Sequence, residues 1–251
     1  MSTGSLYTHI ENNIATVEFY HQASNSLPSE LLKRITNAIT NLSANEDVKV
    51  IVLKSEKERA FCAGASFNEL VTVSNKDEGK QFFMGFANLI NAMRTCSKII
   101  IGRIQGKAVG GGVGLAAACD YCLATEQASI KLSELSIGIG PFVIAPAVER
   151  KIGKAAFTEL SIDAAGWHNA YWAKDKGLFA KVFSTVEELD VEVKNLAFKL
   201  SNYNVEALNE LKKVLWEKTD HWNTLLEQRA ELSGKLVLSD FTKNELNKFK
   251  K

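Results

Sequence analysis

The sequence predicts an α/β fold, because two short apolar runs that are typical of buried strands each lead through a loop into a helical pattern. The runs lie at residues 48–53 and 99–104, and their strand, loop and helix order favours a parallel sheet covered by helices. From residue 186 onward the pattern is almost entirely helical. We therefore expect a core over residues 1–185 and a helical region over residues 186–251.

The N-terminal segment predicts a β-hairpin followed by a helix. Apolar and polar residues alternate over residues 7–10 and 14–19, on either side of Asn12 and Asn13, which are typical of a hairpin turn. Pro28 suits the first turn of a helix, and Ser26 is the candidate N-cap. The apolar face of this helix would consist of Leu31, Leu32, Ile35, Ile39 and Leu42.

The middle of the chain predicts a loop over residues 55–70, a polar mobile segment over residues 71–80 and an amphipathic helix over residues 81–95. A stripe of this kind is typical of a core-facing helix. The stripe consists of Phe82, Phe83, Phe86, Leu89, Ile90 and Met93.

The following elements are expected to complete the α/β core. A strand is predicted near residues 120–124 and a helix over residues 143–152, with Pro146 tolerated near its start. A short helix bounded by glycines follows over residues 166–177, and then a strand over residues 180–183.

Three successive glycines at residues 110–112 lead from a strand into a helix over residues 113–118. Glycine lets a backbone come close to a ligand, and the helix start presents free N–H groups and the positive end of its dipole. This suits a developing negative charge, either of a phosphate or of an enolate oxygen. Two alternatives stay open. One is close strand–helix packing, and the other is a dinucleotide site, because Gly112, Gly114 and Ala117 approximate G-x-G-x-x-A.

The composition is that of an ordinary globular protein. The 251 residues are 46% hydrophobic and 24% charged, and the net charge of +1 indicates neither nucleic acid nor an anionic membrane as a partner. The four cysteines have no disulfide-framework spacing, the four histidines are scattered without a metal-binding pattern, and no signal-peptide or membrane-span pattern is visible. We expect a cytoplasmic protein with no bound metal.

Cys119 and Cys122 form a C-x-x-C pair. Burial of both thiols is favoured over a redox or metal-binding role.

Four motifs lie between residues 60 and 183. They are AFCAGASFNEL at residues 60–70, GKAVGGGVGLAAACDY at 106–121, KLSELSIGIGPF at 131–142 and AKDKGLFAKVF at 173–183. In this order and spacing they resemble the crotonase superfamily, the enoyl-CoA hydratase/isomerase proteins. The resemblance implies a spiral of ββα turns with the CoA-thioester site in the core. It also implies a C-terminal helical trimerisation region, and assembly as a homotrimer or a dimer of trimers.

The resemblance further implies an acyl-CoA thioester as substrate, with coenzyme A as part of that substrate and no separate cofactor. In the family, two backbone N–H groups hold the thioester carbonyl, and on this sequence they would come from Ala63 and Gly111. Two such donors stabilise an enolate oxygen. Trp167 and Trp172 are expected near the end of the acyl pocket. The other residues implied to bind substrate or CoA are Gly64, Ala65, Ser66, Phe67, Gly110 and Phe142.

Family hydratases usually carry two glutamates beside the reacting carbons. On this sequence the second glutamate aligns with Glu134, whereas the position of the first holds Gly114. Moving a double bond needs one base, while adding water calls for one group to activate the water and another to deliver a proton. Because Leu132, Leu135 and Ile137 flank Glu134, its carboxyl is expected to have a raised proton affinity.

Isomerisation of an enoyl-CoA through an enolate is therefore the leading interpretation. Hydration of a 2-enoyl-CoA is the alternative, with bound water or a carboxylate such as Glu69 in place of the missing glutamate. A non-catalytic paralogue that binds acyl-CoA is the alternative from a different class of function. A dinucleotide-dependent oxidoreductase ranks third.

Overall fold

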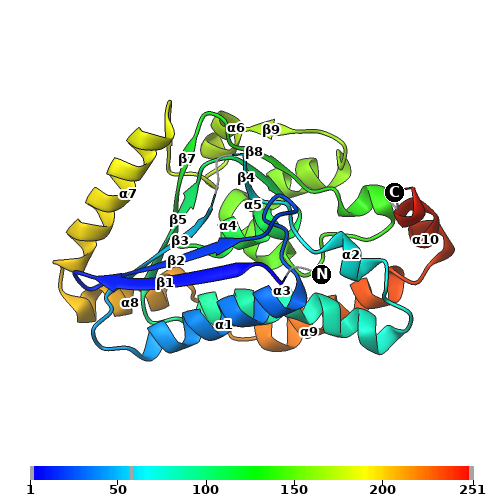
Figure 1. Ribbon diagram of the computed structural model, residues 1–251, viewed down its shortest axis with the longest axis horizontal. Coiled ribbons are helices and arrows are strands. Elements are labelled where there is room, and N and C mark those ends of the chain that lie inside the picture. The colour runs from blue at the N-terminus through cyan, green and yellow to red at the C-terminus, as the bar shows by residue number, and fades with distance from the viewer. Residues whose placement is uncertain (1–2, 57–58, 249–251) are drawn as a thin grey trace.

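A computed structural model of the protein describes residues 3–56 and 59–248 and shows two β-sheets surrounded by helices (Figure 1). In the larger sheet the strand order is β1-β2-β3-β5-β7-β10, and only the β1–β2 pair is antiparallel. Its strands are β1 (Ser5–Glu11), β2 (Ile14–Tyr20), β3 (Val50–Ser55), β5 (Ile99–Ile104), β7 (Tyr121–Thr125) and β10 (Lys181–Phe183). The predicted parallel sheet is confirmed.

The smaller sheet has the order β4-β6-β8-β9 and is built from strands of two or three residues. They are β4 (Ala60–Cys62), β6 (Lys107–Val109), β8 (Ser129–Lys131) and β9 (His168–Asn169). The chain adds a strand to the larger sheet, then one to the smaller sheet, and then forms a helix, as in β3-β4-α3 and β5-β6-α4. This repetition is the spiral of ββα turns that the sequence predicts.

The N-terminal hairpin has the predicted turn, with positive φ angles of 52° at Asn12 and 63° at Asn13. Helix α1 (Ser29–Ala44) buries its predicted apolar face, but its N-cap is Pro28. The expected cap Ser26 instead places its hydroxyl 3.0 Å from Nδ1 of His21. Because proline lacks a capping side chain, the first N–H group of the helix, that of Ser29, donates to the carboxylate of Glu69 at 2.9 Å.

Two sequence expectations between residues 55 and 80 are wrong in part. The predicted loop contains β4 and the one-turn helix α2 (Phe67–Leu70), and helix α3 (Lys76–Thr95) begins five residues before the predicted start at residue 81. Asn75 explains the early start, because its side chain accepts a hydrogen bond from the N–H group of Glu78 at 3.0 Å. The cap thus extends the helix into a polar stretch that lacks apolar periodicity.

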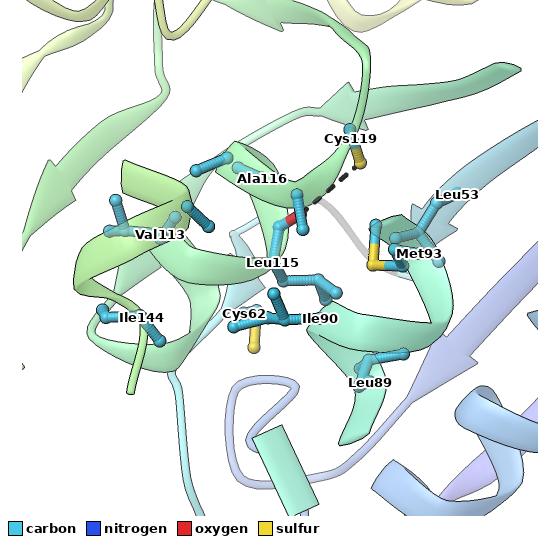
Figure 2. Close-up of a cluster of buried hydrophobic side chains, with 14 of the residues drawn as sticks. Leu53, Cys62, Leu89, Ile90, Met93, Val113, Leu115, Ala116, Cys119 and Ile144 are labelled. Carbon is cyan, nitrogen blue, oxygen red and sulfur yellow. Dashed lines mark hydrogen bonds between the residues drawn. The ribbon is translucent and has the colours of Figure 1, made fainter. Parts of the chain in front are cut away.

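The main core lies between the larger sheet and the helices α1, α3, α4 (Gly111–Ala118) and α5 (Ala145–Ile162). Figure 2 shows α4 at its centre, with the side chain of Leu115 close to Ile90 of α3 and Cys62 of β4. The thiol of Cys119 donates to the carbonyl oxygen of Leu115 at 3.5 Å. All four cysteines are buried and free, as expected.

The C-terminal helices pack back on the core. Helix α7 (Val186–Ser201) covers the outer face of the larger sheet, where Leu189 and Val193 contact Val50 and Ile101. Helix α9 (Trp222–Leu236) lies along α3, and a Cβ on Gly79 would come within 2.6 Å of the carbonyl oxygen of Gly234. The remaining helices are α6 (Ala170–Asp175), α8 (Val205–Leu215), α10 (Asp240–Asn247) and the 3₁₀ helix η1 (Glu134–Ile137). The boundary at residue 186 stays a prediction, and the predicted helical region ends at residue 251, outside the described residues.

Candidate active site

A cavity of about 90 Å³ lies where the β4–α2 segment, the glycine turn and η1 meet α3 and α9. Its walls are mainly apolar. It brings together eight of the nine residues that the sequence assigns to catalysis or substrate binding. They are Ala63, Gly64, Ala65, Phe67, Gly110, Gly111, Glu134 and Phe142.

The glycines of the turn are required by close contacts. Gly110 caps α4 with a positive φ of 53°. A Cβ on Gly111 would lie 2.3 Å from Cε1 of Phe86, and a Cβ on Gly112 would lie 2.3 Å from the carbonyl oxygen of Cys62. Side chains at these positions would displace the α4 start from the cavity.

The N–H groups of Ala65 and Gly111 both lie on the cavity wall and have no hydrogen-bond acceptor among the residues that the structure describes. Ala63, the expected partner of Gly111, differs. Its N–H group donates to the carbonyl oxygen of Ser24 at 3.1 Å, so it is not free for a ligand. The open donor of this segment is two residues later, at Ala65, and the expectation for Ala63 requires this correction.

Glu134 begins η1, and its Oε2 atom is buried without a partner among the described residues. A Cβ on Gly110 would lie 2.6 Å from its Oε1 atom, so the carboxyl group rests against the glycine turn. Burial raises the pKa of Glu134 to about 7, against a smaller opposing effect of its own backbone N–H group. Of its expected apolar flanks, Leu132 is buried and Ile137 lines the cavity, but Leu135 is 47% exposed.

Gly114 lies one turn beyond Gly110 in α4 and faces Ile144. A Cβ on Gly114 would lie 2.3 Å from Cγ2 of Ile144, so no side chain fits there. Among the described residues that line the cavity, Glu134 is the single carboxylate. The first of the two glutamates expected in a hydratase is therefore absent in the sequence, and Ile144 occupies the space that its side chain would need.

Several expected residues lie outside the cavity. Ser66 is turned away because its hydroxyl caps α2, accepting from the N–H group of Glu69 at 3.4 Å. The carboxylate of Glu69 binds the N–H and hydroxyl groups of Ser29, so it does not replace the missing glutamate. Trp167 is 47% exposed beside Lys107, and the ring of Trp172 contacts that of His168 at a tilt of 56°. Neither tryptophan lines the cavity.

The cavity also contains residues that sequence reasoning did not assign to it. Phe82, Phe83 and Phe86 form one wall, although the stripe to which they belong is typical of a core helix. The other half of the stripe, Leu89, Ile90 and Met93, does lie in the core. Ile144 and Ser233 are further wall residues. In the sequence, the three phenylalanines at the start of the stripe were the available sign that this helix lines a cavity. No sequence pattern points to Ile144 or Ser233.

Neither a metal-binding cluster nor a membrane-spanning helix is found in the part of the chain that the structure describes. Within residues 3–56 and 59–248, no group of three or more histidine, cysteine, aspartate or glutamate side chains is placed to hold a metal ion. None of the helices in this part of the chain combines the length and the apolar character needed to cross a bilayer.

Comparison with known proteins is consistent with this geometry. The model of the family "Enoyl-CoA hydratase/isomerase" matches residues 9–250. A peroxisomal Delta(3,5)-Delta(2,4)-dienoyl-CoA isomerase of Arabidopsis thaliana is 30% identical over 206 residues, covering 76% of this chain and 72% of the relative. A "Probable enoyl-CoA hydratase" of Bacillus subtilis is 26% identical over 242 residues, covering 96% of this chain and 93% of the relative.

Solved structures show the same fold. The crystal structure of an enoyl-CoA hydratase from Bacillus halodurans superposes with a TM-score of 0.89 at 23% identity, covering 97% of this chain and 99% of the other. The ββα spiral, the cavity at the glycine turn and the match over residues 9–250 define the class of protein. The chain belongs to the enoyl-CoA hydratase/isomerase family of enzymes, within the crotonase superfamily.

Proposed function

We propose that the protein is an enoyl-CoA isomerase that moves a double bond with Glu134 as its single base. The observation that carries the proposal is the single carboxylate among the described wall residues of the cavity, placed against Gly110. Ile144 leaves no room for a second carboxylate at Gly114. One base is enough for isomerisation, whereas hydration calls for two proton-transfer groups.

In the proposed reaction, the thioester oxygen of a 3-enoyl-CoA accepts hydrogen bonds from the N–H groups of Ala65 and Gly111. Glu134 removes a proton from C2, and the electron pair of that C–H bond forms an enolate conjugated with the C3–C4 double bond. Glu134 then returns the proton to C4, which leaves the double bond between C2 and C3. Each preorganised donor of an oxyanion hole is worth about 3 to 4 kcal/mol of transition-state stabilisation.

The environment of Glu134 supports this role. A base is most effective when its pKa lies near the working pH, and burial holds the pKa of Glu134 at about 7. The unpartnered Oε2 atom has lone pairs available for a substrate proton. Coenzyme A would enter only as part of the substrate, and assembly as a homotrimer or a dimer of trimers stays a prediction of the family resemblance.

Hydration of a 2-enoyl-CoA is the second candidate, because the relative named as a hydratase aligns with 96% of the chain. With one glutamate, a hydratase would have to use bound water or the substrate itself as the second proton carrier. The two candidates therefore predict different products from the same cavity.

The test follows the fate of a 3-enoyl-CoA and a 2-enoyl-CoA, incubated separately in deuterated water with the wild type, Glu134→Gln and Glu69→Gln. Glu69→Gln is the matched control, because that carboxylate binds Ser29 outside the cavity. We expect Glu134-dependent migration of the double bond, with deuterium at C2 or C4 and no added water. Glu134-dependent addition of water would establish the hydratase instead. Binding without any turnover would indicate the non-catalytic paralogue.

A further inference from the structure

Ser233 of α9 is a polar side chain for which the proposed chemistry has no use. It lines the cavity and is 1% exposed, and its hydroxyl has no hydrogen-bond partner among the described residues. A serine inside a helix usually bonds back to the preceding turn. Ser161 and Ser201 do so, at 2.7 Å to the carbonyl of Phe157 and 3.0 Å to that of Phe198. An unpaired buried hydroxyl is costly, so a bound ligand is its natural partner.

Ser233 lies at the opposite end of the cavity from the N–H donors. Phe86 of α3 lies over Gly111, whereas Gly79, seven residues earlier in the same helix, packs against Gly234. Seven residues of α-helix span roughly 10 Å. A thioester carbonyl held at Gly111 would therefore be too far from Ser233 to contact it, and we take the acyl chain as the part of the substrate that reaches this serine.

The surroundings of Ser233 are apolar and uncharged. Leu70, Phe82 and Ile139 cluster with Val237, which lies one turn beyond Ser233 in α9. Among the described residues that line the cavity, Glu134 is the one ionisable group. An acyl chain that ends in a carboxylate would find no cation among the described residues that line the cavity, and an unpaired buried charge is strongly unfavourable.

We propose that Ser233 recognises an uncharged oxygen, a hydroxyl or a keto group, on the acyl chain, so that oxygenated acyl-CoA thioesters are the preferred substrates. The inference rests on the proposed function, because it takes the cavity as the acyl site. A serine hydroxyl can donate to a keto oxygen and can either donate to or accept from a hydroxyl group. The apolar wall on either side would exclude water from this contact.

The test uses binding, so that it does not depend on turnover. Calorimetric titration compares hexanoyl-CoA, its 5-hydroxy and 5-oxo derivatives, and the carboxylate-bearing adipoyl-CoA. Wild type should bind the hydroxy or the oxo compound about tenfold or more tightly than hexanoyl-CoA, and adipoyl-CoA most weakly, because the site is built to satisfy one neutral hydrogen bond. Ser233→Ala should reduce the preference to less than about twofold. Ser201→Ala removes a buried helical hydroxyl outside the cavity and should retain the wild-type preference.

Three results would overturn the inference: equal binding of hexanoyl-CoA and both derivatives by the wild type, a preference that survives Ser233→Ala, or tightest binding of adipoyl-CoA. If no acyl-CoA binds, the proposed function fails together with it. The wild type could also bind the oxygenated compounds selectively, lose this preference in Ser233→Ala and yet show no double-bond migration. That result would support recognition of the acyl oxygen by Ser233 and would contradict only the isomerase assignment.

Discussion

Ile144 lies directly over Gly114, and its Cγ2 atom would be 2.3 Å from a Cβ placed on that glycine. The two residues come from different elements, since Gly114 belongs to α4 and Ile144 precedes α5. Their contact closes the side of the cavity where a hydratase glutamate is expected. Ile144 thus occupies the space that a side chain at position 114 would need, and under the proposed function this leaves Glu134 as the single carboxylate among the described residues of the cavity wall.

The first prediction concerns this pair. Gly114→Glu alone should destabilise the protein by more than about 1 to 3 kcal/mol, because the new side chain overpacks the core and buries a charge. Gly114→Glu combined with Ile144→Ala should relieve the clash and add water addition to double-bond migration. Urea denaturation measures the stability, and product analysis in ¹⁸O-labelled water detects hydration.

The single variant Ile144→Ala is the control for this prediction. It removes buried methyl groups but no hydrogen-bonding group, so it should lower stability and keep the isomerase reaction. A Gly114→Glu protein with the urea midpoint of the wild type would contradict the steric argument.

The second prediction concerns the pH dependence of activity. Because Glu134 acts as a base and its pKa is raised by burial to about 7, kcat/KM should rise about tenfold per pH unit up to that value and then level off. Glu134→Gln should lower kcat by about 10²- to 10⁴-fold and lose this rise. Initial rates between pH 5 and 9 measure both effects. A flat wild-type profile in this range would contradict the assignment of Glu134 as the base.

The third prediction concerns stability at the same residue. The folded-state pKa of Glu134 is about 7 and the ordinary value is 4.5, so the folded protein holds this proton more tightly than the unfolded chain. Stability should therefore fall as pH rises from 4.5 to 7, by roughly 3 kcal/mol from this group. Glu134→Gln has no group that titrates at this position. Its free energy of unfolding should therefore rise relative to that of the wild type as the pH increases from 4.5 to 7. Urea midpoints at a series of pH values provide the measurement.

The sequence predicts those parts of the site whose chemistry requires a residue type at a fixed place in a motif. Gly110, Gly111 and Glu134 are of this kind, and the structure brings all three to one cavity. The sequence places Ala65 in the site but assigns the role of N–H donor to Ala63. The carbonyl of Ser24, from a loop about 40 residues earlier in the chain, accepts from the N–H group of Ala63 and leaves that of Ala65 open, and the local motif does not encode this contact.

Other features could not be predicted because no local pattern encodes them. The three-residue strands β4, β6 and β8 are too short to show a period of two. Ser66 has the residue type for a ligand contact, but the local turn directs it to cap α2. Ile144 and Ser233 reach the cavity only through the packing of α5 and α9 against α4 and α3.

The fourth prediction compares two glycines that both have a positive φ angle. Gly110 and Gly153 have positive φ angles of 53° and 75°, so an alanine at either position should cost about 1 kcal/mol or more of stability from backbone strain. A Cβ on Gly110 would meet the carboxyl group of Glu134, whereas a Cβ on Gly153 has no neighbour within 4 Å. Only Gly110→Ala should therefore also lose most of the kcat of the enzyme. Equal kcat values in two folded variants would contradict the placement of Glu134.

The fifth prediction concerns the attachment of α8 to the core. Lys212 of α8 donates to Asp120 at 2.6 Å, and the two side chains are 3% and 2% exposed. Lys212→Met should cost about 3 to 5 kcal/mol, because it removes the cation that contacts a buried carboxylate directly. Lys213→Met is the matched control. Its side chain is 71% exposed and pairs with Glu210 on the surface, so its loss should cost less than about 1 kcal/mol. Urea denaturation of both variants measures the difference. If Lys212→Met and Lys213→Met unfold at the same midpoint, the Asp120 pair does not hold α8, and the apolar contacts of this helix must do so.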